Sequence, residues 1–429
     1  MVRQKHENAA GPMKNTVMYD LKEVAVDERE AADGGSALAG LWGLREDVAY
    51  LNHGSFGACP KAVLAMQTEF RRRLEASPWR YQVLEMTKLY HESLARLAAF
   101  VGADFEEVVF VPNATHGVNT VLRSLKFHPG DELLTCDHDY FACRNALAFT
   151  ARRNGAEVKI AHVPFPLQNS REIIDAMLAA ATERTRLVLI DHVTSPTGLI
   201  FPVEELVCAF AQRGIETLVD GAHAPGMIPL NLRALGATYY TGNCHKWICA
   251  PKGAAFLYVD KKRQADIHPL PISHVAAEVR PPVSAFHHEF FWAGTIDSSA
   301  YLCVAHALDY MERLVPGGWP EIMARNHALT VAARKLLCEA LQIEPPCPEE
   351  MIGSLASVPL PDADDFPDPV PPWYVEPLQE ALFQVDRIDV PVIYHPKPPH
   401  RLLRVSGQLY NHSGQYEKLA RVLTAWWPR

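Results

Sequence analysis

Seven apolar runs, separated by stretches with helical periodicity, occupy the chain between residues 107 and 260. The runs are residues 108–111, 132–136, 158–163, 187–191, 217–220, 239–241 and 254–259. The amphipathic stretches between them include 117–125, 142–153, 173–181 and 203–212. Strands that alternate with helices predict an α/β fold with a doubly wound, mostly parallel seven-stranded sheet flanked by helices. The link before residue 254 is too short for a crossover helix, so we expect at least one antiparallel strand.

The rest of the chain predicts a second, smaller domain. Amphipathic spacing predicts helices at 61–76, 84–100, 298–314, 319–341 and 415–425. Residues 345–399 hold fourteen of the 33 prolines, which predicts loops between short elements because proline is excluded from helix interiors and central strands. Late strands are expected at 389–394 and 402–405. We therefore predict an N-terminal arm at 1–44, a large domain at 45–297 and a smaller α/β C-terminal domain at 298–429.

Charge and composition argue against several classes of protein. The net charge is −9 and the 41 basic residues form no stripe, so we expect neither a nucleic-acid partner nor an anionic membrane. The sequence contains no apolar run of signal-peptide or membrane-spanning length, which favours a cytoplasmic protein. The nine cysteines form no Cys-x-x-Cys pair, and we expect buried reduced thiols at Cys136, Cys143, Cys208 and Cys303. We interpret His287-His288-Glu289 as a polar loop and predict no metal site.

A carboxylate and an amine follow two of the predicted strands. Asp220 ends the run 217–220, and Lys246 follows the run 239–241 after a short polar turn. Ligands of open α/β sheets bind beyond the carboxyl ends of the strands, so both side chains should reach one crevice. A lysine that loses water there has a lowered pKa and can attack an aldehyde, while a nearby aspartate holds a ring nitrogen protonated. This pairing is the one that pyridoxal 5′-phosphate requires.

A phosphate site is expected where the strand 108–111 leads into a helix. Ala114 and Thr115 follow Asn113 at this point and can offer backbone N–H groups and a hydroxyl at a helix N-terminus. Asn113 or Thr115 can equally be a plain helix cap. Asn243 and His245, just before Lys246, could add two more donors.

Arg404 is a charge in the middle of the apolar run 402–405. A buried arginine needs a partner, and its planar fork matches a carboxylate. No acidic residue lies beside it in the sequence, so a substrate carboxylate is favoured, although a structural ion pair stays open.

At this point the chain resembles a known family, the class V branch of pyridoxal-phosphate enzymes of fold type I, and within it the isopenicillin N epimerase-like group. The resemblance runs from about residue 50 to the C-terminus. The matching motifs are Leu51-Asn52-His53-Gly54-Ser55-Phe56-Gly57, Asn113-Ala114-Thr115, Asp139-Tyr140, His192-Val193-Thr194-Ser195-Pro196-Thr197-Gly198, Asp220-Gly221-Ala222-His223, His245-Lys246-Trp247, Ala293-Gly294-Thr295 and Arg404-Val405-Ser406.

The resemblance implies a role for each matching position. Lys246 would form the Schiff base, Asp220 would face the pyridine nitrogen and Tyr140 would stack on the ring. Thr295 would reach the phosphate of the neighbouring subunit, which implies a homodimer with composite active sites. The cofactor-binding positions that it implies are Ala114, Thr115, Tyr140, Ser195, Asp220, His223, Asn243, His245, Lys246 and Thr295. The substrate-binding positions that it implies are Arg404 for the α-carboxylate, with His53 and Ser55 in a loop over the substrate.

The reaction stays open among several outcomes at the Cα of an amino acid. The favoured reaction is epimerisation, in which Lys246 acts with a second acid such as Tyr140 or a side chain of the partner subunit. C–S β-lysis of cysteine or a cysteine conjugate is almost level with it, and transamination is a third outcome. Persulfide chemistry is disfavoured because no cysteine follows Cys347. A non-catalytic regulatory protein would be expected to have lost Lys246 or Asp220, and this chain keeps both. A dinucleotide-binding dehydrogenase would show Gly-x-Gly-x-x-Gly after its first strand, and this chain lacks that motif.

Overall fold

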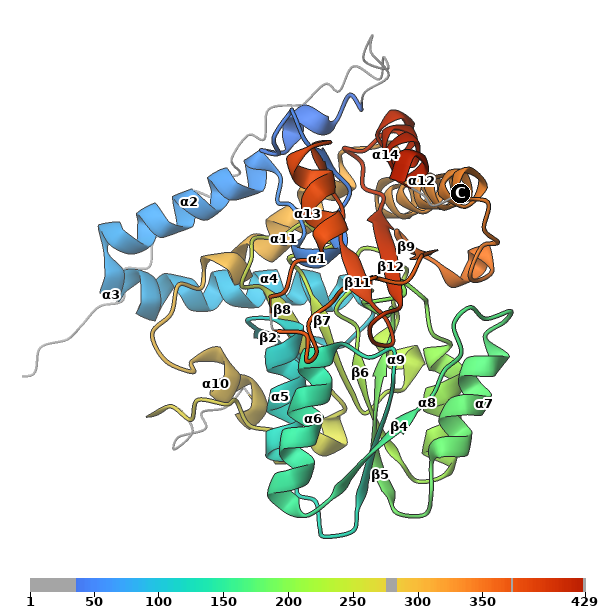
Figure 1. Cartoon of the computed structure of the whole chain (residues 1–429). Coiled ribbons are helices and arrows are strands. Elements are labelled where there is room, and N and C mark those ends of the chain that lie inside the picture. Colours follow the sequence, from blue (N-terminus) through green and yellow to red (C-terminus); the bar gives the residue numbers. More distant parts are fainter. Residues whose placement is uncertain (1–35, 275–283, 372, 427–429) are drawn as a thin grey trace, which may run out of the picture.

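The computed structural model describes residues 36–274, 284–371 and 373–426. Its centre is the predicted seven-stranded sheet, with the strand order β2-β8-β7-β6-β5-β3-β4 (Figure 1). The strands are β2 (Val108–Val111), β3 (Glu132–Cys136), β4 (Glu157–Ala161), β5 (Thr185–Asp191), β6 (Glu216–Asp220), β7 (Tyr239–Asn243) and β8 (Ala255–Val259). Only β8 runs antiparallel to its two neighbours, β7 and β2, which confirms the expected antiparallel strand.

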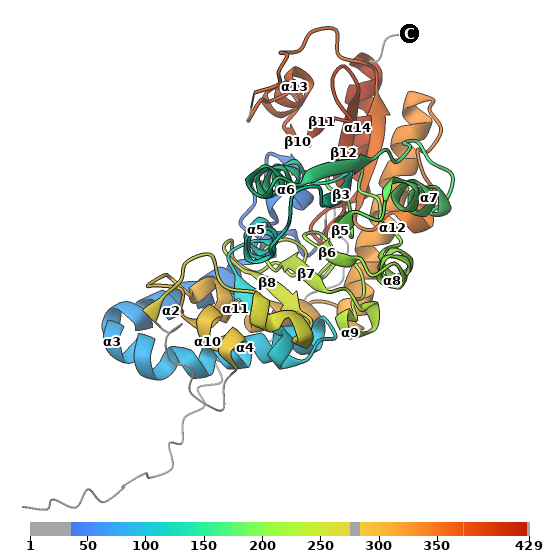
Figure 2. The same ribbon diagram turned by 90° about the horizontal axis from the view of Figure 1, so that it is seen from below.

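Helices cover both faces of this sheet, so the strands are largely buried on both sides, except the edge strand β4, in which only Ala161 is buried. One face carries α5 (Ala114–Ser124) and α6 (Phe141–Asn154), and the other carries α7 (Arg171–Ala180), α8 (Val203–Gln212) and the short α9 (Leu232–Leu235) (Figure 2). Alternate residues of one strand therefore enter different cores. Val109 and Val111 join the core under α5 and α6, whereas Val108 and Phe110 join the core on the opposite face.

A group of N-terminal and late helices packs against the end of the sheet at β2. It consists of α2 (Lys61–Ala76), α3 (Pro78–Arg80), α4 (Met86–Phe100) and α11 (Ser299–Glu312). A π-helical turn at Tyr81–Glu85 joins α3 to α4, so the helix predicted from residue 84 begins with irregular geometry. The segment before α2 contains β1 (Ala49–Tyr50) and α1 (His53–Phe56).

The smaller C-terminal domain holds a three-stranded antiparallel sheet in the order β11-β12-β9. Its strands are β9 (Leu355–Leu360), β11 (Val392–Tyr394) and β12 (Arg401–Ser406), and its helices are α12 (Gly318–Leu341), α13 (Pro377–Gln384) and α14 (Ser413–Trp426). The two-residue strand β10 (Ile388–Asp389) pairs in parallel with β1, so the N-terminal segment is joined to this domain by backbone hydrogen bonds.

Two expectations from the sequence are wrong. His287-His288-Glu289 is not a polar loop but part of helix α10 (Ala285–Phe291), where Ser284 caps the helix by accepting the His287 N–H and the His287 ring is buried. Cys208 is exposed on α8, because it lies on the face of that helix turned away from the sheet.

Among the described residues, no three His, Cys, Asp or Glu side chains are arranged to hold a metal ion. The same residues include no helix with the length and apolar character needed to cross a membrane.

Candidate active site

A cavity of about 490 Å³ opens at the carboxyl ends of the central strands. It lies where β5, β6 and β7 end and where α5 begins. The sequence-predicted residues that line it are Ser55, Ala114, Thr115, Tyr140, Ser195, Asp220, His223, Asn243, His245, Lys246 and Arg404. Residues from the N-terminal segment, the large sheet and the C-terminal domain therefore meet in one place.

Lys246 presents an amine without a counter-ion to this cavity. Its Nζ lies 3.0 Å from Nε2 of His223, and no carboxylate of the described residues forms a salt bridge with it. Removal from water lowers the pKa of Lys246 to about 7, and the positive charge of Arg404 contributes in the same direction. The amine is therefore partly neutral near neutral pH and can act as a nucleophile or base.

Asp220 lies at the floor of the cavity with its carboxylate held by two donors. The Cys143 thiol donates to Oδ2 over 3.0 Å, and the Ala222 N–H donates to Oδ1 over 2.9 Å. Burial raises the pKa of Asp220, whereas both hydrogen bonds favour its charged form. A carboxylate fixed in this way can hold a proton on a heterocyclic nitrogen.

The first turn of α5 forms the opposite end of the site. Asn113 caps the helix by accepting the His116 N–H over 2.8 Å, and the Ala114 N–H donates to Oδ1 of Asn243 over 2.9 Å. Gly117 lets the helix approach β7 closely, since a Cβ at this position would lie 2.2 Å from Oγ1 of Thr241. Because the N–H groups of Ala114, His116 and Gly117 already donate to Asn243 or Asn113, the turn can offer a phosphate the Thr115 N–H and hydroxyl together with the helix dipole.

Arg404 is a buried cation without an acidic partner. Its Nη1 donates to the Ser195 carbonyl over 2.6 Å and to Ser195 Oγ over 3.1 Å, while Nη2 donates to Ser55 Oγ over 2.9 Å. Nε has no partner, and no described acidic residue forms a salt bridge with the guanidinium. Burial lowers the pKa of Arg404 to about 10, but the group stays charged at neutral pH. A charged guanidinium with a free Nε can bind an anion that enters the cavity.

Two further predicted residues, Tyr140 and His245, take different positions around the cavity. Tyr140 precedes α6 and has a side chain that is 44% exposed, so its ring is accessible from the cavity. His245 keeps part of its ring in the cavity wall while Nδ1 lies 3.2 Å from the Ala254 carbonyl.

The structure does not bring His53 or Thr295 into the cavity wall. His53 is fully buried beneath the lysine, with Nε2 3.0 Å from the Lys246 carbonyl and Nδ1 2.8 Å from the Tyr410 hydroxyl. It therefore supports the backbone of Lys246 rather than reaching the cavity. Thr295 is exposed in the segment between α10 and α11.

Two residues of the site were missed from the sequence. Asp191 ends β5 as Asp220 ends β6, and both line the cavity, so the same strand-end argument would have found it. Cys143 follows Tyr140 by one helical turn, but its contact with Asp220 depends on how α6 packs on the sheet, which no local pattern reveals.

The donor set fits pyridoxal phosphate. An amine able to bind an aldehyde, a carboxylate for a ring nitrogen and a helix start for a phosphate line a single cavity. The residues that would hold the cofactor are Lys246, Asp220, His223, Ala114 and Thr115.

Comparison with known proteins gives a consistent result. The family model "Aminotransferase class-V" matches residues 49–365. The chain is 32% identical to isopenicillin N epimerase of Streptomyces clavuligerus, over 88% of this chain and 94% of the relative. It is 31% identical to a probable chloroplastic L-cysteine desulfhydrase of Arabidopsis thaliana, over 87% of this chain and 82% of the relative.

Solved structures share the fold at lower identity. The apo cysteine desulfurase of Thermococcus onnurineus NA1 superposes with a TM-score of 0.72 at 22% identity, over 93% of this chain and 98% of that one. A mutant of the cystine C–S lyase C-DES, with glycine covalently linked to its pyridoxal-phosphate cofactor, gives a TM-score of 0.73 at 20% identity, over 88% of this chain and 97% of that one.

Proposed function

Because the chain belongs to the class V aminotransferase family and is a pyridoxal-phosphate enzyme of fold type I, we propose that it epimerises an amino acid at Cα. In this proposal Lys246 removes the Cα proton, as in the isopenicillin N epimerase-like group. The observation that carries it is the amine of Lys246, with a pKa of about 7, in the same cavity as the unpaired guanidinium of Arg404. A base and a carboxylate site are the two groups that an amino acid substrate requires.

The residues that line the cavity have different roles in this reaction. When bound, pyridoxal phosphate supplies a sink for the electron pair that remains on Cα. Asp220 keeps a proton on the pyridine nitrogen, and the first turn of α5 holds the phosphate. Arg404 orients the substrate by its α-carboxylate, and Lys246 takes the proton from Cα.

Epimerisation also needs an acid that returns a proton from the opposite side. Tyr140 is our candidate, because its half-exposed side chain borders the cavity and burial raises its pKa, so that the hydroxyl keeps its proton. A side chain of a second subunit is the other candidate. In Tyr140→Phe, hydrogen exchange at Cα should persist while inversion of the chiral centre is lost.

C–S β-lysis is the second candidate function. It is supported by sequence identity, because this chain is 31% identical to a probable L-cysteine desulfhydrase and 32% identical to the epimerase. Elimination needs only Lys246 and a leaving group, so it makes no demand on Tyr140. Transamination is a third outcome of the same proton removal.

One experiment separates these reactions. Candidate amino acids are incubated with the enzyme in heavy water, and Cα exchange, chirality, pyruvate and ammonia are followed together. Exchange with inversion supports the epimerase, whereas pyruvate, ammonia and a sulfur fragment support the lyase. Conversion of the cofactor to its amine form, reversed by a keto acid, supports an aminotransferase. Loss of the carboxylate without prior Cα exchange contradicts all three.

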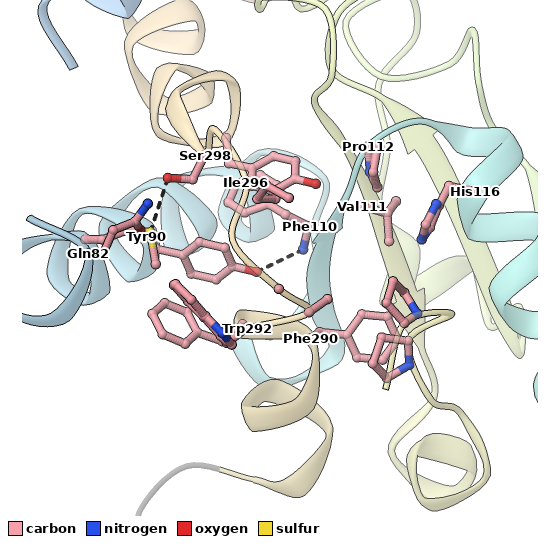
Figure 3. Close-up of a pocket in the computed structure, with 17 residues that line it drawn as sticks. Gln82, Tyr90, Phe110, Val111, Pro112, His116, Phe290, Trp292, Ile296 and Ser298 are labelled. Carbon is pink, nitrogen blue, oxygen red and sulfur yellow. Dashed lines mark hydrogen bonds between the residues drawn. The ribbon is translucent and has the colours of Figure 1, made fainter. Parts of the chain in front are cut away.

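We further propose a homodimer with composite sites, in which Thr295 reaches the phosphate of the neighbouring subunit. The support is an apolar pocket of about 110 Å³ beside the exposed Thr295 segment. Figure 3 shows Tyr90, Trp292 and His116 around this pocket, and His116 belongs to the first turn of α5. Ile296 at its edge is 52% exposed and free to meet a second copy.

Hybrid dimers test the composite site. Lys246→Ala subunits and Thr295→Ala subunits are co-expressed with different tags, and the mixed dimers are isolated. Activity above that of either parent variant supports the shared site. A fully active monomer in sedimentation experiments contradicts it.

The proposed compartment is the cytoplasm, and the proposed partners are a small-molecule amino acid substrate and a second copy of the chain. All nine cysteines are free, as expected in a reducing compartment. Fractionation of cells with an antibody against the protein tests this, and recovery in an organelle fraction would contradict it.

A further inference from the structure

Two carboxyl groups lie side by side at the floor of the cavity. Asp191 ends β5 and Asp220 ends β6, and the two are direct partners in the register of these parallel strands. Both are almost fully buried, with 3% and 2% of their surface exposed, and both line the cavity. Close, buried carboxyl groups cannot both ionise without a large cost, so one of them must keep its proton.

The hydrogen bonds decide which carboxyl group carries the charge. Asp220 accepts from the Cys143 thiol and from the Ala222 N–H. Asp191 accepts one hydrogen bond, from the backbone N–H of Tyr140, and its buried Oδ1 has no partner among the described residues. Asp220 therefore has two donors and Asp191 has one. Donors favour the ionised form, so the negative charge belongs on Asp220 and the proton on Asp191.

The other charged and titratable groups near Asp191 do not change this assignment. Asp139 is engaged with Arg144, whose Nε lies 2.6 Å from its Oδ1. Burial raises the pKa of the Cys136 and Cys143 thiols well above the usual value, so both are neutral. Burial, Asp220 and Asp139 together raise the pKa of Asp191 well above its usual range, and the Tyr140 N–H hydrogen bond and the Lys246 charge oppose this only in part.

We propose that Asp191 is a positioning residue of the cofactor site, a protonated carboxylic acid that leaves Asp220 as the single negative charge at the cavity floor. The inference rests on the proposed role of Asp220 opposite the pyridine nitrogen. Its consequence is that the cofactor meets one carboxylate and one neutral O–H donor rather than two anions. The unpaired Oδ1 and the proton of Asp191 are then available to a bound group in the cavity.

Infrared difference spectroscopy of the holoenzyme tests the proton directly. A protonated carboxylic acid has a carbonyl stretch that a carboxylate lacks. Subtraction of the Asp191→Asn spectrum from that of the parent enzyme at neutral pH should reveal this band, because the acid is present only in the parent. If the difference spectrum contains a carboxylate band instead, Asp191 is ionised and the proposal is overturned.

The pH titration of the bound cofactor's visible absorption gives a second readout. Asparagine replaces a neutral acid with a neutral amide, so Asp191→Asn should keep the midpoint of the titration within a few tenths of a pH unit. Loss of a negative charge would lower the midpoint by about one unit or more, since nearby anions stabilise the protonated chromophore. A shift of that size in Asp191→Asn overturns the proposal.

Asp220→Asn is the matched control, because it removes the charge that the proposal assigns to the floor and should lower the midpoint. Cofactor binding to Lys246 distinguishes a wrong role for Asp191 from a wrong proposed function. A missing acid band with cofactor still bound to Lys246 rejects the role of Asp191 alone.

Discussion

Nζ of Lys246 lies 3.0 Å from Nε2 of His223, and no described carboxylate forms a salt bridge with either nitrogen. Two cations at this distance would repel, so at least one group must be neutral. Burial lowers the pKa of His223 well below its usual value, and the nearby Lys246 charge adds to this. His223 is thus a neutral imidazole whose Nε2 accepts a hydrogen bond from the amine of Lys246.

The first prediction concerns the pH dependence of cofactor capture. The pKa of Lys246 is about 7, and only the neutral amine attacks an aldehyde. The rate at which apoprotein captures pyridoxal phosphate should rise with pH through about 7 and then level off. Stopped-flow absorbance measures it. A rate that keeps rising towards the ordinary lysine pKa, near 10, would show that the cavity does not lower the pKa of the amine.

The second prediction concerns the donor to Asp220. Cys143→Ala removes the thiol that donates to Oδ2, and hydrogen bonds to charged groups are worth about 1.5–3 kcal/mol. The turnover rate should fall about tenfold or more, while Cys143→Ser, which keeps a donor, should lose much less. Equal rates in the alanine and serine variants would show that the Cys143 thiol does not support Asp220.

Replacement of Asp220 itself should have a larger effect. Asp220→Asn should keep the cofactor bound but slow the reaction at least about a hundredfold, the scale of losing one pre-organised electrostatic contact.

The third prediction concerns the substrate carboxylate. Arg404→Ala should raise the substrate dissociation constant by the equivalent of about 2–5 kcal/mol, the cost of truncating one partner of a desolvated charge pair. Arg401→Ala is the control on the same strand, because Arg401 pairs with Glu376 and does not line this cavity. It should lower stability without changing substrate affinity. Parent-like affinity in Arg404→Ala would withdraw the role of Arg404.

The fourth prediction concerns the glycine beneath the lysine loop. Gly57 has φ 72° and ψ 165°, and a Cβ there would lie 2.0 Å from the His245 carbonyl oxygen. Gly57→Ala should destabilise the protein by at least about 1–3 kcal/mol from its backbone conformation alone, and should weaken cofactor binding because His245 precedes Lys246. Gly43→Ala, with nothing within 4 Å of its Cβ, is the control. Thermal unfolding and cofactor retention measure both effects.

Most strands of the large sheet can be predicted from the sequence because they are buried on both faces, whereas the edge strand β4 is largely exposed. The buried strands are unbroken apolar runs, so β2 and β3 begin and end at the predicted residues. Helices α2 and α8 also match their predicted bounds, since each has one apolar face toward the core.

The C-terminal domain was less predictable because proline hides its elements. β9 contains Pro359 and was missed, but it pairs on one side only, with β12, and an edge strand tolerates proline. Helix α13 begins at Pro377, where the missing N–H has no partner to lose, and Glu376 caps it by accepting the Leu378 N–H. The predicted strand 389–394 is divided into β10 and β11 around Pro391.

The site likewise contains residues that can be predicted from the sequence and contacts that cannot. Asp220 and Lys246 follow strand ends, so their convergence follows from the topology of the sheet. The contacts of His53 with the Lys246 carbonyl and the Tyr410 hydroxyl join segments far apart in sequence, and no local pattern reports them.

The central claim is that Lys246 binds the cofactor covalently, and borohydride reduction followed by peptide mass mapping tests it most directly. The holoenzyme should lose its yellow colour, and a phosphopyridoxyl group should be found on the peptide that contains Lys246. Lys252 provides an internal comparison, because its amine donates to the Gly57 carbonyl over 2.9 Å and does not line the cavity. A label on Lys252 or any other lysine, or no bound cofactor at saturating pyridoxal phosphate, would contradict the account.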